Sequence, residues 1–516
     1  MIIEFLNDQR WPATGPVNHL TIQQLAIMPV SSMDDSQIQA IIERVMREVG
    51  QPTPAAPAAP SPAPSRVPPA AMPRGDDGLF ATLDEAVNAA EAAYRALNRM
   101  PLAIRKDMVA HMRQAGREYA TVLAEMAQSE TGMGRVEDKV LKNILNADKA
   151  QGPEALETEA WSGDGGLTIT EYAPYGVIGS LTPSTNPTST VICNAIGMIS
   201  AGNAVVFNAH PSAKGASNRT VQILNQAIQR AGGPANLLTA VADPTIETAT
   251  GLMGHNGIRL LVVTGGAAVV RAAMRSGKRA VCAGPGNPPV VVDETADIEQ
   301  AGRDIVIGGS FDNNIVCTTE KETLAVDAIC DDLIQAMTRH GAVRLNRWQF
   351  DRLWRAVIVT DRGPGKYADM NKAFIGKNAA VLLAEIGISA GPEVRQIVAE
   401  VDKTHPAVWS EQMMPIMPVV RVANADEAID LAVAAEHGFR HTAVMHSKNL
   451  DNLSRMAREI NCSIFVKNGP CLAGLGYGGE GYCSFTIASP TGEGLTGPRS
   501  FSRLRRCTLV DSFRIV

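Results

Sequence analysis

The sequence lacks the patterns that mark membrane, secreted and nucleic-acid-binding proteins. No apolar run approaches the roughly 20 residues that a membrane-spanning helix requires. Residues 1–10 contain no basic region followed by an apolar stretch, so we expect no secretory signal. The formal net charge is only -6, and no run of lysine and arginine is interleaved with aromatic residues. We therefore expect neither a nucleic-acid partner nor a membrane partner.

Disulfide, metal and dinucleotide fingerprints are missing as well. The eight cysteines form no C-x-x-C pair, so we expect reduced thiols in a cytoplasmic protein. Neither H-E-x-x-H nor any other zinc-like spacing occurs, so we expect no metal site. No predicted strand leads into G-x-G-x-x-G, and no strand rich in Val and Ile closely precedes the glycine-rich run at 474–481, which we predict to be a loop.

The first 75 residues differ from the rest of the chain. We leave residues 1–33 unassigned and expect them to be disordered; Met28 and Met33 are alternative translation starts. Residues 34–50 carry apolar side chains with helical spacing and polar side chains between them, which predicts an amphipathic helix. Residues 51–75 are mostly Pro and Ala and are predicted to be a stiff linker. Because so short a helix cannot bury its apolar face alone, we expect an external partner; the alternative is that it folds back onto its own chain.

From residue 76 onward the pattern is that of an α/β protein, long enough for two or three domains. Three apolar strands each end in a polar turn that leads into a helix, at 176–181, 204–207 and 260–263. This repetition predicts a parallel, helix-covered sheet, whose ligands bind at the carboxyl ends of its strands. We predict a Rossmann-like cofactor-binding domain at 76–286, an α/β catalytic domain at 287–475 and a C-terminal segment at 476–516. The last of these, with a hairpin at about 160–175, is expected to form a β oligomerisation arm.

Among the cysteines, Cys317 is the candidate nucleophile. It lies in the stretch F-D-N-N-I-V-C-T-T-E-K at 311–321, between an amide-rich turn and a polar segment. A structural cysteine is usually surrounded by aliphatic residues, whereas Cys317 has them on one side only.

Several ordered motifs resemble the aldehyde dehydrogenase superfamily, in particular its CoA-acylating branch, the ethanolamine- and propanediol-utilisation aldehyde dehydrogenases of bacterial microcompartments. They are L-T-P-S-T-N-P-T-S-T at 181–190, F-N-A-H-P at 207–211, T-G-G at 264–266 and the stretch around Cys317. The resemblance implies the reaction aldehyde + CoA + NAD+ → acyl-CoA + NADH, with propionaldehyde favoured and acetaldehyde next. It also implies a dimer or tetramer, and an encapsulation role for residues 34–50, which would bind shell or cargo proteins in the lumen of a microcompartment.

The resemblance assigns the chemistry to two residues. The Cys317 thiolate would attack the aldehyde carbon, and the Asn186 side-chain amide, with the Cys317 backbone N–H, would stabilise the oxyanion. The alternative for Asn186 is a turn residue before Pro187. Cofactor contacts are expected at Thr182, Pro183, Ser184, Thr185, Asn208, His210, Pro211, Thr264, Gly265, Gly266, Val269, Ala283, Gly284, Glu411 and Met413. Glu411 matches the glutamate that binds the nicotinamide ribose, and its alternative is a surface charge.

One departure from the superfamily favours CoA as the acyl acceptor. Hydrolytic members carry a water-activating glutamate in an E-L-G-G-K segment, and Cys282 occupies that position here. A neutral thiol is a poor general base, so the thioester should persist for an incoming thiol. Cys282 itself is interpreted as a packing residue. His441 and Asn468 could approach the acyl pocket but are left out of the catalytic set.

Two alternatives stay open. One is a non-acylating member of the superfamily, either hydrolytic or phosphorylating, and the other is a catalytically silent assembly protein. We further expect NAD+ and CoA to use one cleft in turn.

Overall fold

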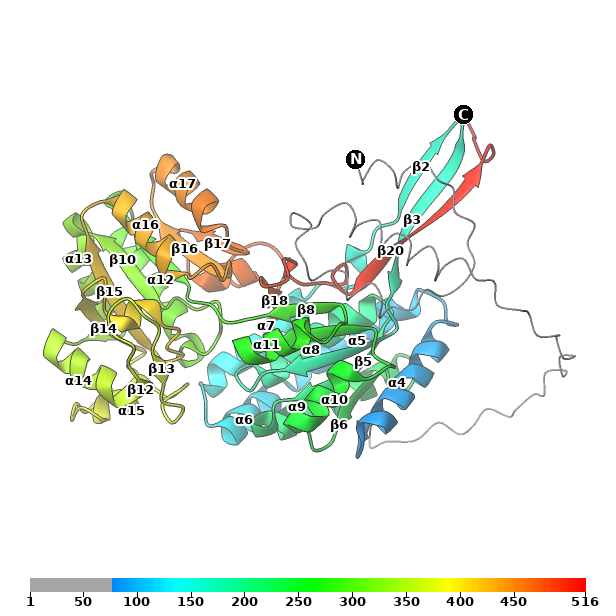
Figure 1. Cartoon of the computed structure of the whole chain (residues 1–516), viewed down its shortest axis with the longest axis horizontal. Coiled ribbons are helices and arrows are strands. Elements are labelled where there is room, and N and C mark those ends of the chain that lie inside the picture. Colours follow the sequence, from blue (N-terminus) through cyan, green and yellow to red (C-terminus); the bar gives the residue numbers. More distant parts are fainter. Residues whose placement is uncertain (1–76) are drawn as a thin grey trace, which may run out of the picture. The chain divides into compact units, whose positions relative to one another are not determined.

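The computed structural model describes residues 77–516, coloured from blue to red in Figure 1. The predicted helix at 34–50, its linker and the unassigned residues 1–33 lie outside the described residues. Among residues 77–516, no helix is both long and apolar enough to cross a membrane.

The first sheet has six parallel strands in the order β1-β6-β5-β4-β7-β8. Its central strands are almost continuous runs of Val, Ile, Leu and Ala, because helices cover both faces. The strands are β1 (Leu79–Phe80), β4 (Val177–Thr182), β5 (Ala204–Ala209), β6 (Leu238–Val241), β7 (Leu260–Thr264) and β8 (Ala280–Ala283). The helices are α4 (Leu83–Leu97), α5 (Ile104–Glu118), α6 (Ala120–Thr131), α7 (Val136–Lys149), α8 (Pro187–Ser200), α9 (Lys214–Arg230), α10 (Ile246–Gly254) and α11 (Ala267–Met274).

The second sheet has seven parallel strands in the order β11-β14-β15-β10-β9-β16-β17. Its strands are β9 (Pro289–Val292), β10 (Glu322–Val326), β11 (Ala342–Arg344), β14 (Gln396–Val401), β15 (Ile416–Val422), β16 (Thr442–His446) and β17 (Ile464–Lys467). The helices are α12 (Ile298–Ser310), α13 (Asp327–Arg339), α14 (Arg347–Val357), α15 (Ala379–Ala384), α16 (Ala425–Ala435) and α17 (Leu450–Ile460). The α/β prediction is confirmed. The predicted domain boundaries stay a prediction, although each sheet falls within one predicted domain.

A third, antiparallel sheet joins segments that are far apart in the sequence. Its strands are β2 (Glu159–Gly163), β3 (Gly166–Pro174) and β20 (Ser502–Val510). β20 pairs with β3 along its whole length, from Ser502 opposite Pro174 to Val510 opposite Gly166 (Figure 1). The predicted hairpin and the C-terminal segment therefore meet in one sheet, and its role in oligomerisation stays a prediction.

Candidate active site

Cys317 follows a tight turn with a strained backbone. The short helix η4 (Phe311–Asn314) ends α12, and three of its residues in succession have positive φ: Asp312 at 47°, Asn313 at 55° and Asn314 at 65°. Left-handed backbone costs about 1–2 kcal/mol for each non-glycine residue. Such a run persists only where the surrounding structure holds it.

The side chains of the same turn supply that support. The Asn313 side chain donates a hydrogen bond of 2.8 Å to the Gly376 carbonyl and accepts one of 3.0 Å from Arg135 Nε. Asn314 donates 2.8 Å to the Glu320 carbonyl. Asp312 Oδ1 accepts 2.8 Å from the Arg135 backbone N–H. The amide-rich turn predicted before Cys317 is thus a turn whose side chains fasten it to three other parts of the chain.

The polar segment after Cys317 is not a solvated face. Residues 318–321 are all fully buried. The Lys321 ammonium donates to the Asn314 carbonyl at 2.8 Å, to Asn314 Oδ1 at 2.6 Å and to Thr319 Oγ1 at 2.8 Å. Burial lowers the pKa of Lys321, and the Glu411 carboxylate opposes that shift. A buried ammonium therefore ties both ends of the Cys317 loop together.

The thiol itself is held in its neutral form. Loss of hydration raises the pKa of Cys317 to about 12, and Glu411 acts in the same direction, whereas Lys321 and Lys142 act against it. At neutral pH the thiol is protonated, so forming the nucleophile requires a proton acceptor or a change in the charges around it.

The catalytic segments gather at the amino edge of the second sheet. Cys317 precedes β10, Gly286 precedes β9, His441 precedes β16 and Glu411 precedes β15, and these four strands are neighbours. The Gly286 N–H donates to Glu411. A Cβ atom on Gly286 would lie 2.9 Å from the Cys317 carbonyl oxygen and 3.0 Å from His441 Cγ. Glycine is therefore required where these segments meet.

His441 is a site residue that the sequence analysis left out. Its Nδ1 is 2.9 Å from Thr442 Oγ1, and its buried Nε2 has no hydrogen-bond partner among the described residues. Burial and the Lys321 ammonium lower the pKa of His441 to about 3, so the imidazole is neutral. The free Nε2 lone pair is placed to accept a hydrogen bond or a proton, but the lowered pKa makes the imidazole a weak base. Asn468, also left out, is fully engaged with the Ser447 backbone at 2.8 and 2.9 Å.

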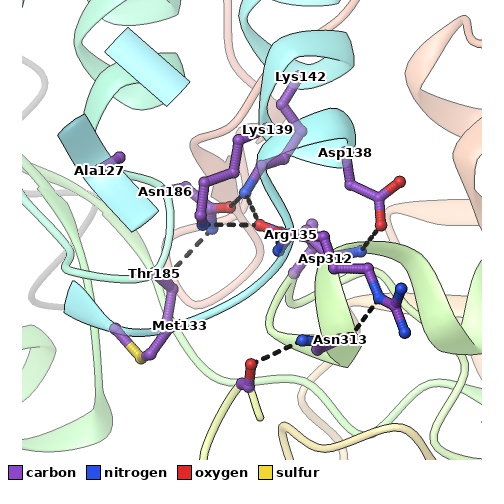
Figure 2. Close-up of polar contacts among 12 residues, drawn as sticks. Ala127, Met133, Arg135, Asp138, Lys139, Lys142, Thr185, Asn186, Asp312 and Asn313 are labelled. Atoms are coloured by element: carbon purple, nitrogen blue, oxygen red, sulfur yellow. Dashed lines mark hydrogen bonds and ion pairs between the residues drawn. The ribbon is translucent and has the colours of Figure 1, made fainter. Parts of the chain in front are cut away.

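Asn186 occupies the N-cap position of α8, yet its side chain does not cap that helix. Its Oδ1 accepts 2.6 Å from Lys142 Nζ, and its Nδ2 donates 3.2 Å to Thr185 Oγ1 (Figure 2). Lys142 lies on α7 and also acts on the pKa of Cys317. Asn186 is therefore more than a turn residue, because its amide is oriented by a buried cation.

Lys142 is the second residue that the sequence analysis missed. The helix α7 carries a buried polar face, formed by Asp138, Lys139, Lys142, Asn143 and Asn146. An amphipathic helix is recognised by a buried apolar stripe, and this helix replaces part of that stripe with charges. No sequence signal indicated that these charges point inward.

Apart from Glu411 and Met413, which precede β15 of the second sheet, the predicted cofactor residues lie at the carboxyl edge of the first sheet or just beyond it. Thr182 stands opposite Ala209, and Thr264 opposite Ala283, so the ends of β4, β5, β7 and β8 are level. The Thr182 hydroxyl is buried and has no partner among the described residues. Gly266 begins α11, where no side chain caps the helix and the space beside its Cα is open. Free N–H groups at a helix start suit a pyrophosphate, so the edge fits a dinucleotide.

The side chains of the other predicted cofactor residues differ in their burial and in whether they already have a hydrogen-bond partner within the chain. Asn208 Oδ1 accepts 2.7 Å from Thr248 Oγ1, and His210 Nδ1 lies 2.8 Å from Ser212 Oγ, so each is partly engaged. Glu411 is buried, which makes the surface-charge alternative wrong. Burial raises its pKa to about 6. Pro183, Ser184 and Thr185 lie in the β4–α8 turn, Pro211 begins a short helix, Val269 lies on α11, Gly284 follows β8 and Met413 has positive φ.

Cys282 lies on β8 and is fully buried. Burial raises the pKa of its thiol to about 11, with Glu493 acting in the same direction. The thiol is therefore neutral at physiological pH, and a neutral thiol is a poor general base for water.

A model of the aldehyde dehydrogenase family matches residues 76–482. Acetaldehyde dehydrogenase (acetylating) EutE of Salmonella typhimurium is 51% identical over 442 residues, which cover 85% of this chain and 94% of the relative. Rhodopseudomonas palustris propionaldehyde dehydrogenase, solved with bound CoA and an acylated cysteine, is 47% identical with a TM-score of 0.82, over 84% of this chain and 98% of that one. A propionaldehyde dehydrogenase from the Clostridium phytofermentans fucose utilisation bacterial microcompartment is 45% identical with a TM-score of 0.82, over 85% and 100% of the two chains.

Proposed function

This chain belongs to the aldehyde dehydrogenase family, and we propose that it is a CoA-acylating aldehyde dehydrogenase that converts a short aliphatic aldehyde, CoA and NAD+ to acyl-CoA and NADH. The observation that carries the proposal is that the chain combines the candidate nucleophile Cys317 with a neutral, buried thiol at position 282. A thioester formed at Cys317 meets no carboxylate at the position from which hydrolytic members activate water.

In the first step the Cys317 thiol gives up its proton to water, and the sulfur attacks the aldehyde carbon to form the oxyanion of a thiohemiacetal. The developing oxyanion is stabilised by the Asn186 Nδ2 amide and the Cys317 backbone N–H. NAD+ supplies the hydride acceptor when it is bound along the carboxyl edge of the first sheet. Glu411, buried near Cys317, would hold the ribose next to the nicotinamide. Loss of hydride from the thiohemiacetal leaves the acyl group on Cys317 as a thioester.

The second step is transfer of the acyl group to the thiol of CoA. His441 has the only free imidazole nitrogen among the described residues next to the Cys317 loop, and its low pKa keeps it neutral. We assign it as the acceptor of the thiol proton as the CoA sulfur attacks the thioester, on the position of its free Nε2; its low pKa opposes this transfer. The two solved relatives described above are propionaldehyde dehydrogenases, and the curated relative acts on acetaldehyde. We therefore take C2 and C3 aldehydes as the substrates, propionaldehyde first.

The assembly is part of the same proposal. The strand β20 is exposed from residue 503 onward and carries the exposed apolar side chains of Leu504, Leu509 and Val510, which supports a dimer or tetramer built through this sheet. The microcompartment origin of one relative supports residence in such a compartment, with residues 34–50 binding a shell or cargo protein.

Continuous NADH formation in the presence and absence of CoA tests the reaction. With CoA, NADH accumulates through many turnovers; without it, formation stops near one NADH per Cys317. Steady turnover without CoA would instead support a hydrolytic or phosphorylating enzyme. If Cys317→Ala leaves NADH production unchanged, any NADH formed comes from a background activity and not from Cys317, which would support the silent assembly protein. Values of kcat/KM for acetaldehyde, propionaldehyde and butyraldehyde then rank the substrates.

His441→Asn separates the two half-reactions. We expect the single turnover of NADH without CoA to be retained, and CoA-dependent turnover to fall by about 10²-fold, the usual contribution of a general base. His446→Asn is the matched control, because His446 is also buried with an unpartnered Nε2 but lies at the opposite end of β16. An equal loss of both half-reactions in His441→Asn would contradict the assigned role.

A further inference from the structure

Lys142 contacts two segments that are far apart in the sequence, through Asn186 and Asp312. Its side chain is 2% exposed. The ammonium donates 2.6 Å to Asn186 Oδ1 and also donates to Asp312 Oδ2 (Figure 2). Asn186 follows β4 of the first sheet, whereas Asp312 belongs to the turn before Cys317. One side chain thus connects the segments that carry the two oxyanion donors.

The chemistry of Lys142 determines which way the Asn186 amide faces. An ammonium group donates hydrogen bonds and accepts none, so it binds Oδ1 and excludes Nδ2. A rotated amide would bring its own N–H groups against the cation. With Oδ1 turned toward Lys142, Nδ2 faces away, where one hydrogen meets Thr185 Oγ1 at 3.2 Å. The second hydrogen remains for a substrate oxygen.

Asp312 fixes Lys142 in place and also supports the turn. Its Oδ1 accepts 2.8 Å from the Arg135 N–H, and its Oδ2 accepts 3.0 Å from Lys139. Its own N–H donates 2.8 Å to Asp138 Oδ2. Asp312 is therefore attached to α7 through several bonds, and only Lys142 continues the connection to Asn186.

We propose that Lys142 is a positioning residue for the oxyanion site: it holds the Asn186 amide with Nδ2 toward the substrate and sets its position relative to the Cys317 turn through Asp312. The inference rests on the proposed function, because it assumes the oxyanion role of Asn186.

Lys142→Met removes the donor and keeps the length of the side chain. Lys139→Met is the matched control. Lys139 lies on the same helix, is equally buried and binds the same carboxylate, but it has no described contact with Asn186. Both variants are made in the wild-type chain and in Asn186→Ala. The readouts are the rate of the single-turnover NADH burst, the KM for CoA and the melting temperature.

We expect Asn186→Ala to slow the burst by about 10²–10³-fold, the usual effect of losing one oxyanion donor. Lys142→Met should slow it at least tenfold, with the KM for CoA unchanged, and should add less than about threefold in the Asn186→Ala background. Lys139→Met should slow it less than about threefold. Full additivity of Lys142→Met with Asn186→Ala, or equal losses in Lys142→Met and Lys139→Met, would overturn the inference.

A second variant covers the case in which Lys142→Met does not fold. Lys142→Gln retains an N–H donor without the charge, so we expect an intermediate loss that again disappears in Asn186→Ala. An additive loss in Lys142→Gln would count against the inference. The oxyanion role of Asn186 and the positioning role of Lys142 can be disproved separately. A normal burst in Asn186→Ala removes the proposed oxyanion role, whereas a slow burst in Asn186→Ala with a normal one in Lys142→Met removes only the role of Lys142.

Discussion

Two buried ammonium groups flank the Cys317 loop, and they are satisfied in different ways. Lys142 faces a carboxylate, Asp312, and the amide oxygen of Asn186. The hydrogen bonds of Lys321 go to neutral oxygens of its own loop, and the Glu411 carboxylate acts on it only through space. Both lie close enough to Cys317 to lower the pKa of its thiol.

The difference shows that buried charge can serve two purposes at one site. The charge of an ammonium bound by neutral oxygens is poorly compensated, but the ammonium fixes the position of each of those oxygens. Lys321 therefore determines the conformation of the loop itself. An ammonium bound by a carboxylate from another element connects the two elements, so Lys142 sets their relative position. Removing each lysine should therefore give a different pattern of defects.

Lys321→Met should have the largest effect. It leaves several buried oxygens of the loop without a donor, which costs about 1–3 kcal/mol for each unsatisfied group. We expect a lower melting temperature than for Lys142→Met, measured by calorimetry, and a loss of activity of about 10²-fold as the Cys317 N–H moves. Alkylation of Cys317 should also slow, since Lys321 lowers its pKa. Equal melting temperatures for the two variants would remove the distinction between them.

Glu411→Gln should make Cys317 more reactive while lowering dehydrogenase activity. The Glu411 carboxylate raises the pKa of the thiol, so its removal should lower that pKa. A fall of one unit gives about tenfold more thiolate, and the lower nucleophilicity of a more acidic thiol reduces the gain to about threefold. The rate at which iodoacetamide labels Cys317 near neutral pH, at about pH 7.5, measures this gain in reactivity. Slower labelling would show that Glu411 acts on Lys321 more strongly than on the thiol.

Lys142 should also make the stability of the fold depend on pH. Burial lowers the pKa of Lys142 from its ordinary value of 10.5 to about 8, although Asp312 opposes this shift. Between these values the unfolded chain binds more protons than the folded one, so stability rises with pH. Relative to Lys142→Met, the wild-type chain should gain about 2 kcal/mol as the pH rises from 8 toward 10.5. Parallel melting curves for the two proteins over this range would contradict the assigned shift.

The features that follow local patterns were predictable. The strand-turn-helix repetition predicted the first sheet. The predicted cofactor residues Thr182, Thr264 and Gly266 lie at its carboxyl edge because parallel strands end together there. The family and its nucleophile motif were recognisable for the same reason, since each motif is contiguous in the chain. The confirmed predictions are the α/β fold, membership of the aldehyde dehydrogenase family and the CoA-acylating branch.

The features that depend on distant segments were not predictable. The rule that ligands lie at carboxyl ends points away from the second sheet, where the catalytic segments precede the strands. His441 was left out because it lies beside Gly286 only through the pairing of β16 with β9. Lys142 gave no signal because an inward-facing charge and a solvated one look alike in a sequence.

The sequence by itself predicted the candidate nucleophile and the strands whose ends we propose to hold the cofactor, and it determined that position 282 carries no carboxylate. These features depend on residue type and on neighbours along the chain. Only the tertiary structure decided which charges are buried and what they face. The Lys142–Asp312–Asn186 connection joins residues separated by 44 and 170 positions. Their hydrogen bonds depend on how two sheets and α7 pack together, which no local pattern encodes.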